Sequence, residues 1–157
     1  REYHASDLDA CHALLERYRD TVALALAWDR GDLAVELDRP DVARTVVWER
    51  DGRIRAMINY VLHDQLGRTT ERYAWINHVA FPDLSRSEQV AFLRAWLHRI
   101  RAEGIVATVD FGRRGWPAAP FYRTRFIPYP RAVQLVSWTF HPELSLAGIP
   151  IVYEIQV

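Results

Sequence analysis

The sequence predicts an α/β domain, a mixed and mostly antiparallel sheet with a central parallel strand pair, flanked by helices. Three observations predict this fold class. An Asp-Gly turn joins two long strand-like segments, a long amphipathic helix separates two further ones, and two helix-like segments precede them all. The chain has 157 residues, of which 50% are hydrophobic, a size that suits one core. We therefore expect residues 1–157 to form a single domain.

The first part of the chain is expected to hold two helices. Residues 7–20 repeat apolar side chains at helical spacing, and Asp7 is placed to cap that helix. Residues 31–40 predict a second, shorter helix that Pro40 stops. The N-terminal helices are thus predicted from local periodicity.

The middle of the chain is expected to form three strands. Residues 43–65 read as a β-hairpin whose turn is Asp51-Gly52. Residues 71–81 are rich in aromatic and β-branched residues, which favours another strand.

A long helix is expected from about residue 87 to 103, and Gly104 ends it. Its apolar stripe consists of Val90, Leu93, Leu97 and Ile100, widened by Phe92 and Trp96. Residues 105–111 are a nearly continuous apolar strand, which predicts burial on both faces. A strand, a crossover helix and a second strand normally form a right-handed parallel unit, whose first loop is a common ligand site.

The last part of the chain is expected to be irregular and then to end in two strands. Residues 112–130 contain one helical turn around Phe121, and residues 132–140 and 149–157 read as strands.

Composition argues against several classes of function. Twenty acidic residues balance twenty basic ones, so no overall field favours nucleic acid or an anionic membrane as a partner. No apolar run approaches the roughly 20 residues that span a bilayer. Cys11 is the only cysteine, and no histidines have metal-ligand spacing, so we expect no disulfide, no metal and a cytoplasmic location. The chain begins at Arg1 rather than methionine, which suggests processing or a piece of a longer protein.

Four stretches resemble one known family in their order and spacing. These are REYHASDLDACHALL at residue 1, VWERDGRIRAMINYVL at residue 47, INHVAFP at residue 76 and APFYRTRFIPYP at residue 119. They are similar to the first strand and helix, the second and third strands, the fourth strand and the late tyrosine segment of the GNAT superfamily. The resemblance covers nearly the whole chain and implies an acyl-CoA-dependent N-acyltransferase fold.

The resemblance also implies where acetyl-CoA would bind as a co-substrate. Val79, Ala80 and Phe81 would present backbone groups to the pantetheine arm. The pyrophosphate loop of the family, Q/R-x-x-G-x-G/A, falls on residues 85–90, and this assigns Arg86 and Ser87 to the phosphates.

The pyrophosphate loop departs from the family pattern. Glu88 and Val90 stand at its two glycine positions. Ser85 and Glu88 have instead the spacing of a capping box, which uses an amide that a pyrophosphate needs and adds a negative charge. A side chain at Val90 also crowds the close backbone approach that glycine permits. An ordinary helix start explains this stretch better than an intact phosphate cradle.

Candidate groups for acid–base chemistry are few. The carboxylate of the fourth family strand is replaced by Ala74, so His78 is the candidate base, with a structural histidine as the alternative. In the family's Tyr-x-x-x-Gly-Phe segment, with Phe126 at its end, the tyrosine position holds Phe121 and the glycine position Arg125. Tyr122 is one residue late; it is the candidate acid, and the alternative is a half-buried packing residue.

Two functions remain open from the sequence. The first is an N-acyltransferase that moves an acetyl group from acetyl-CoA to a small-molecule or peptide amine. The alternative is a non-catalytic GNAT-like domain, which would act as the structural, dimerisation or substrate-shaping half of a larger enzyme. Its partner would be a second GNAT domain or a second copy of the chain.

Overall fold

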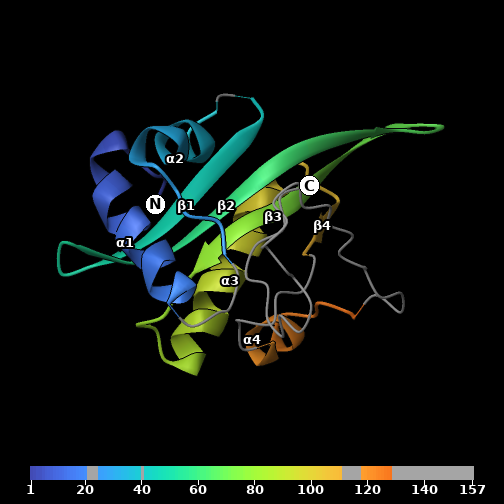
Figure 1. Ribbon diagram of the computed structural model, residues 1–157. Helices are drawn as coiled ribbons and strands as arrows, with labels where there is room; N and C mark the ends of the chain where they lie inside the picture. Colours follow the sequence, from blue (N-terminus) through green and yellow to red (C-terminus); the bar gives the residue numbers. More distant parts are fainter. Residues whose placement is uncertain (21–24, 40, 111–117, 129–157) are drawn as a thin grey trace, which may run out of the picture.

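The computed structural model describes residues 1–20, 25–39, 41–110 and 118–128 (Figure 1). A 3-10 turn, η1 (Ala5–Asp7), leads into α1 (Leu8–Arg19). The remaining elements, in chain order, are α2 (Arg30–Leu37), β1 (Ala43–Arg50), β2 (Arg53–Leu66), β3 (Thr70–Ala80), α3 (Arg86–Ala102), β4 (Ala107–Val109) and α4 (Ala119–Arg123). Both predicted N-terminal helices, the hairpin, the third strand and the long helix are confirmed.

The sheet is mixed, as the sequence predicts. Its strands lie in the order β1-β2-β3-β4; the first three are antiparallel neighbours, and β4 runs parallel to β3. The turn of the first hairpin is Asp51-Gly52, and both residues have positive φ angles of 52° and 69°, which an Asp-Gly turn accommodates. The helix α3 is the crossover between the parallel strands.

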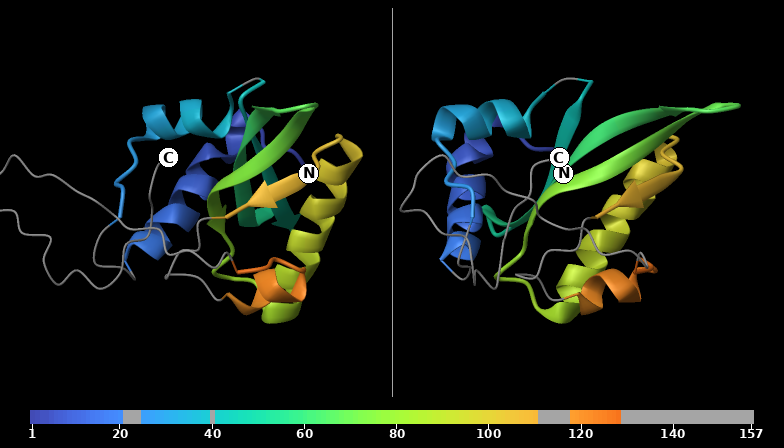
Figure 2. Two further views of the ribbon diagram at one scale, coloured as in Figure 1. Left: turned by 90° about the vertical axis from the view of Figure 1, so that its right-hand side faces the viewer. Right: turned by 45° about the vertical axis from the view of Figure 1, so that its right-hand side comes forward.

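Helices cover both faces of the sheet (Figure 2). Consecutive residues of β2 show the two faces, because side chains alternate along a strand. Tyr60 packs its ring edge-on against Trp96 of α3, with centroids 5.6 Å apart. Its neighbour Asn59 donates a hydrogen bond to the backbone of α2 at Glu36. The core therefore has two layers. The helix α3 packs on one face of the sheet, and α1 and α2 pack on the other.

The N-terminal segment pairs with the outer edge of β1 but forms only an isolated bridge, not the expected strand. The amide of Tyr3 donates to the carbonyl of Thr45 over 3.0 Å, and that of Val47 donates to Arg1 over 2.9 Å. Asp7 does not cap α1 as expected. Its carboxylate accepts the amide of His4 at 2.9 Å and two guanidinium bonds from Arg1, and the bonds from Arg1 lower the pKa of Asp7. The arginine provides a stronger partner than the first-turn amides of α1.

The expectation for residues 105–111 is only partly correct. The strand that forms, β4, has three residues, and Val106 and Ala107 are exposed. Within the described residues, α1 and α2 lie over β1 to β3, so no described helix covers that face of β4 (Figure 1). The two strands expected at residues 132–140 and 149–157 lie outside the described residues. No helix in the described part of the chain is long and apolar enough to cross a membrane.

The end of α3 is fixed by Gly104, as predicted. Its φ angle is +82°, and the amides of Gly104 and Ile105 donate to the carbonyls of Arg101 and Ile100, both over 3.1 Å. This is the Schellman arrangement, which satisfies the last carbonyls of a helix.

Replacement of Gly104 by alanine is therefore expected to lower the free energy of unfolding by about 1 kcal/mol, because a Cβ is unfavourable at positive φ. Chemical denaturation measures the effect. Gly67→Ala is the matched control, since Gly67 has no positive φ and an added Cβ meets its nearest atom at 3.6 Å. Equal costs at both positions would contradict this account of the helix end.

Candidate functional site

A β-bulge near the end of β3 shapes the candidate site. Asn59 of β2 pairs with His78, whereas the next residue, Tyr60, pairs with Ile76. Asn77 is thus the extra residue, and the bulge turns two consecutive polar side chains toward α2. The amide of Asn77 donates to the Oε1 atom of Glu36, and His78 Nε2 lies 4.0 Å from the same oxygen.

Glu36 is a buried carboxylate, only 4% exposed. Asp29 is the N-cap of α2, and its side chain accepts the amide of Gly31 at 2.7 Å. On the buried face of this helix Glu36 lies between the buried side chains of Leu33 and Leu37. Its second oxygen, Oε2, forms an ion pair with Arg39, whose side chain is 47% exposed.

Asn59 ties this carboxylate to the sheet. Its Nδ2 donates to the Glu36 carbonyl at 3.2 Å and to Thr45 Oγ1 at 2.9 Å, and its Oδ1 accepts from Asn77 at 3.2 Å. The Thr45 hydroxyl in turn donates to the carbonyl of Leu37 at 2.6 Å. We call Glu36, Thr45, Asn59, Asn77 and His78 the Glu36 cluster.

The segment before α2 lies against His78. The rings of His78 and Trp28 meet edge to face, with centroids 5.2 Å apart. The carbonyl of Trp28 is 3.1 Å from the His12 ring of α1. His78, the candidate base, is fully buried under this tryptophan.

The expected pantetheine residues follow His78 directly. Val79, Ala80 and Phe81 are fully buried at the end of β3. The register of β3 with β4 runs from Tyr73 to Trp75, whereas β3 continues to Ala80. The end of β3 thus extends beyond its described ladder with β4, directly after Asn77 and His78.

The start of α3 is the capping box that the sequence predicts. Ser85 Oγ accepts the amide of Glu88 at 3.4 Å, and Glu88 Oε2 accepts the amide of Ser85 at 2.8 Å. The hydrogen bonds from Ser85, with Arg50 nearby, lower the pKa of Glu88. Arg50 donates to Glu88 Oε1 at 2.9 Å. Arg86 and Ser87, the expected phosphate contacts, are exposed beside this carboxylate, and Ser87 Oγ lies 3.1 Å from Ser85 Oγ.

Two arginines, one from α1 and one from β2, form ion pairs with the loop between β3 and α3. Asp83 accepts two hydrogen bonds from Arg17 of α1, at 2.7 and 2.8 Å, and these lower the pKa of Asp83. Arg55 of β2 lies 3.9 Å from the same carboxylate. The Gln89 amide donates to the carbonyl of Leu84 at 3.0 Å. The position of the α3 N-terminus relative to the end of β3 is therefore fixed by side chains.

The turn after α4 contains one residue in the left-handed backbone conformation. Arg125, at the glycine position, has a φ angle of +72°. The amides of Phe126 and Arg125 donate to the carbonyls of Phe121 and Tyr122, both over 3.1 Å, which is a second Schellman motif. The rings of Phe121 and Phe126 pack with centroids 5.1 Å apart, the contact that accompanies this motif.

This turn places Phe121, not Tyr122, toward the end of β3. Phe121 is buried, with its ring centroid 6.3 Å from that of Phe81. Tyr122, the candidate acid, lies on the outer side of α4 and is 55% exposed. The structure thus brings His78, Val79, Ala80 and Phe81 together and leaves Tyr122 at the surface.

Sequence reasoning missed Glu36, Thr45 and Asn59. Local signals mark two of these three residues. Glu36 interrupts the apolar stripe of α2, and Asn59 interrupts the apolar strand AMINYVL. A polar side chain at a position of the core pattern is a candidate for a hydrogen-bonded network.

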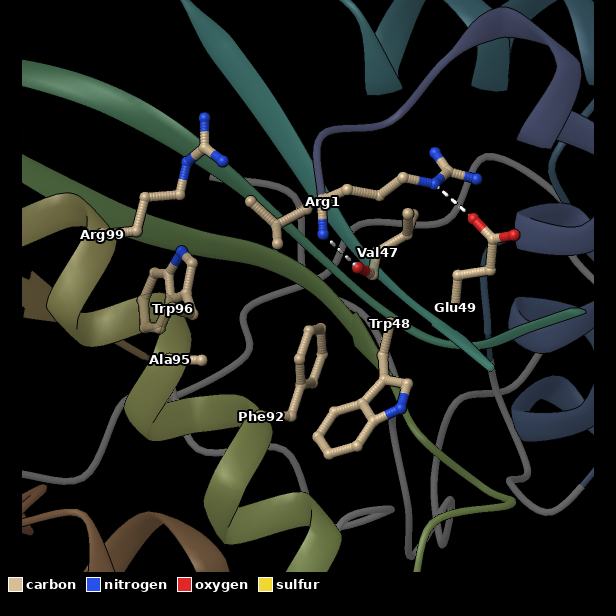
Figure 3. A pocket seen from close by; sticks show the side chains of 9 residues that line it. Arg1, Val47, Trp48, Glu49, Phe92, Ala95, Trp96 and Arg99 are labelled. Carbon is tan, nitrogen blue, oxygen red and sulfur yellow. Dashed lines mark hydrogen bonds and ion pairs between the residues drawn. The ribbon is translucent and has the colours of Figure 1, made fainter. Parts of the chain in front are cut away.

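A pocket on the opposite face of the sheet is a separate feature (Figure 3). It lies between β1 and α3, where the rings of Trp48, Phe92 and Trp96 line it. Its charged rim is internally paired, since Arg1 Nε donates to Glu49 over 2.5 Å. The Glu36 cluster does not reach this pocket. Among the described residues, no group of three or more His, Cys, Asp or Glu side chains could hold a metal ion.

Several solved structures share this fold, and three of them are acetyltransferases by name. An acetyltransferase from Trypanosoma brucei has a TM-score of 0.66 and 19% identity, over 87% of this chain and 97% of that one. A ribosomal-protein-alanine N-acetyltransferase from Brucella melitensis biovar Abortus 2308 has a TM-score of 0.65 and 14% identity, over 88% and 98%. An aminoglycoside acetyltransferase from a soil metagenomic sample, in complex with sisomicin, has a TM-score of 0.67 and 14% identity, over 90% and 95%.

Comparison by sequence gives no such match. No protein-family model matches the chain, and no curated protein resembles it in sequence. At identities of 14–19%, the likeness to the three structures concerns the fold alone.

Proposed function

We propose that this chain, whose fold is that of the GNAT acetyltransferases, transfers an acetyl group from acetyl-CoA to an amine. One observation carries the proposal. The β3 bulge turns Asn77 and His78 toward Glu36, immediately before the strand end formed by Val79, Ala80 and Phe81. A proton acceptor and a strand end suited to a pantetheine arm are thus consecutive on one strand.

In this proposal, the thioester and the acceptor amine approach the end of β3 from different sides. The acetyl thioester would lie along Val79, Ala80 and Phe81, and the acceptor amine would approach from the α2 side. The amine nitrogen attacks the thioester carbonyl, so that a C–N bond forms and the C–S bond breaks. His78 takes the proton that the nitrogen loses. The thiolate of CoA is protonated by water, because Tyr122, the acid candidate from the sequence, lies on the outer side of α4.

Access and phosphate binding both need local adjustments. Trp28 covers His78, so the acceptor reaches the imidazole only when this indole moves aside. Arg86 and Ser87 would contact the pyrophosphate at the start of α3, where Glu88 opposes it electrostatically. We expect weak acetyl-CoA binding for this reason. A cytoplasmic location and a small-molecule or peptide acceptor complete the proposal.

Release of free CoA tests the proposal. The protein is incubated with acetyl-CoA and a panel of amines, and the new thiol is followed with a thiol-reactive dye. We expect amine-dependent release that falls by about 100-fold in His78→Gln, the usual size of a general-base contribution. His63→Gln, a change on the part of β2 away from α2, should retain the wild-type rate. Thermal unfolding of both variants shows whether a loss of rate is a loss of fold.

The alternative, a non-catalytic GNAT-like domain, is favoured by two observations. The carboxylate of Glu88 occupies the helix start where the pyrophosphate belongs, and Phe121 brings no hydroxyl to the end of β3. Such a domain would bind a second GNAT domain or a second copy of itself and shape the substrate site. No release of CoA with any amine, from a folded protein, would favour this alternative.

A further inference from the structure

We propose that Glu36 binds the charged nitrogen of the acceptor, and that the acceptor is an amine on a linear aliphatic chain that takes the place of Arg39. This inference rests on the proposed acetyl transfer, since it names the substrate class of the same site. Its evidence is the burial of Glu36, the partners of its two oxygens and their positions relative to His78.

A buried carboxylate needs a cation or several donors. Glu36 is 4% exposed, and the cost of removing its charge from water is large unless it is paired. Asn77 supplies a neutral donor to Oε1. Arg39 supplies the cation at Oε2 from the same helix end. The carboxylate thus has two partners, one fixed neutral donor and one arginine.

Arg39 is the partner that an incoming cation can replace. Its side chain lies three residues beyond Glu36 and is 47% exposed, so a ligand cation can reach its position from solvent. Asn77, in contrast, is fixed by the bulge of β3 and by its hydrogen bond to Asn59. A ligand cation that displaces Arg39 therefore leaves the rest of the Glu36 cluster in place.

The shape of the displaced group indicates the class of acceptor. The Arg39 side chain is an unbranched aliphatic stem that ends in a cation. A linear alkylamine, such as a diamine or a lysine side chain, has the same form with an ammonium head. A compact ammonium can satisfy a single carboxylate oxygen, as Oε2 requires.

The position of His78 makes this arrangement useful for transfer. Its Nε2 lies 4.0 Å from Glu36 Oε1, and Arg39 pairs with Oε2, so the imidazole and the incoming ammonium would share one carboxylate. The ammonium gives one proton to His78, and the neutral nitrogen then attacks the thioester. As the C–S bond breaks, the nitrogen loses its second proton, which passes through water to the departing thiolate. Glu36 holds the nitrogen in place and takes no part in the proton transfer, so its removal should weaken amine binding more than it slows the chemical step.

The competing explanation is that Glu36 only anchors α2 to the sheet. Glu36→Gln separates the structural role from the binding role, because glutamine keeps an oxygen for Asn77 and loses the charge. A purely structural residue would change the melting temperature and leave the affinity for amines as it was. Arg39→Ala provides the opposite change, since it frees Oε2 for the ligand.

Calorimetric titration with 1,5-diaminopentane, and separately with Nα-acetyl-lysine amide, tests the inference without acetyl-CoA. We expect the wild type to bind at least one of them, Glu36→Gln to bind about tenfold more weakly and Arg39→Ala about tenfold more tightly, as expected when a close charge pair is lost or released. Glu71→Gln, an exposed carboxylate on β3, is the control that should bind like the wild type. The neutral analogue 1,5-pentanediol should not bind.

The outcomes separate this inference from the proposed transfer. Equal affinity in the wild type and Glu36→Gln, or no binding of either amine to the wild type, would overturn the inference. Amine binding that depends on Glu36 would support it even if no CoA is released, a result that would count against the transfer alone. Binding of the lysine derivative but not the diamine would identify a peptide as the source of the amine.

Discussion

Replacement of Asn59 by leucine is expected to lower the free energy of unfolding by about 3 kcal/mol, because it leaves several buried polar groups without partners. Asn59 is fully buried and holds the Glu36 carbonyl, the Thr45 hydroxyl and the Asn77 amide together. Leucine has a similar volume and no hydrogen-bonding atoms, so packing is largely retained while the network is lost.

Urea denaturation measures this effect, and Gln65→Leu is the matched control. Gln65 is an exposed amide on the same strand, β2, so its replacement should change stability by less than about 0.5 kcal/mol. If both substitutions cost the same, the Glu36 cluster does not stabilise the α2 layer. If Asn59→Leu were stabilising, the cluster would be a functional feature maintained against stability.

The double replacement Glu88→Gly with Val90→Gly is expected to have two large and opposite effects. The affinity for acetyl-CoA should rise at least tenfold, because a negative charge leaves the helix N-terminus and the backbone becomes accessible to a pyrophosphate. Stability should fall by about 2–3 kcal/mol, since a cap is lost and two glycines enter a helix.

Calorimetry and thermal unfolding of the same samples measure both effects. Glu88→Gln separates charge from backbone access, because glutamine can still accept the Ser85 amide while the ion pair with Arg50 is lost. We expect this single variant to gain a small part of the affinity at little cost in stability. Loss of stability without any gain in affinity would show that residues 85–90 are only a helix start.

Charged side chains of the chain itself occupy both ligand positions of the proposed site. Glu88 lies at the start of α3, where a phosphate would bind, and is paired with Arg50. Arg39 lies on Glu36, where a cationic acceptor would bind. Each internal ion pair has one exposed arginine, whose place a ligand can take from solvent.

Local signals were sufficient to predict most of the described fold. Helical spacing identified α1 and α3, the Asp-Gly turn identified the β1–β2 hairpin, and Ser85 with Glu88 identified the capping box. Each of these depends on residues close together in the chain. The cap expected of Asp7 was wrong because Arg1, six residues away, competes successfully for the same carboxylate.

The candidate site was less predictable because it is built by tertiary contacts. Glu36 and Asn77 are 41 positions apart, and only the packing of α2 on a bulged β3 brings them together. The bulge itself has no clear local signal in WINHVA. Arg125, which the resemblance places at a glycine position, has the left-handed conformation that favours glycine. The place of Tyr122 on the outer side of α4 follows from that turn.

Titration of the wild-type protein with acetyl-CoA by calorimetry tests the central claim most directly. We predict saturable binding in the micromolar to millimolar range, with competition by CoA, and a stabilisation of roughly 2.7 kcal/mol at about 100 times the dissociation constant. Ala80→Leu, checked for folding by thermal unfolding, should abolish the binding, because Ala80 lies at the strand end assigned to the pantetheine arm. A folded wild-type protein that binds no acetyl-CoA at millimolar concentration would contradict the claim and leave a GNAT fold without its co-substrate.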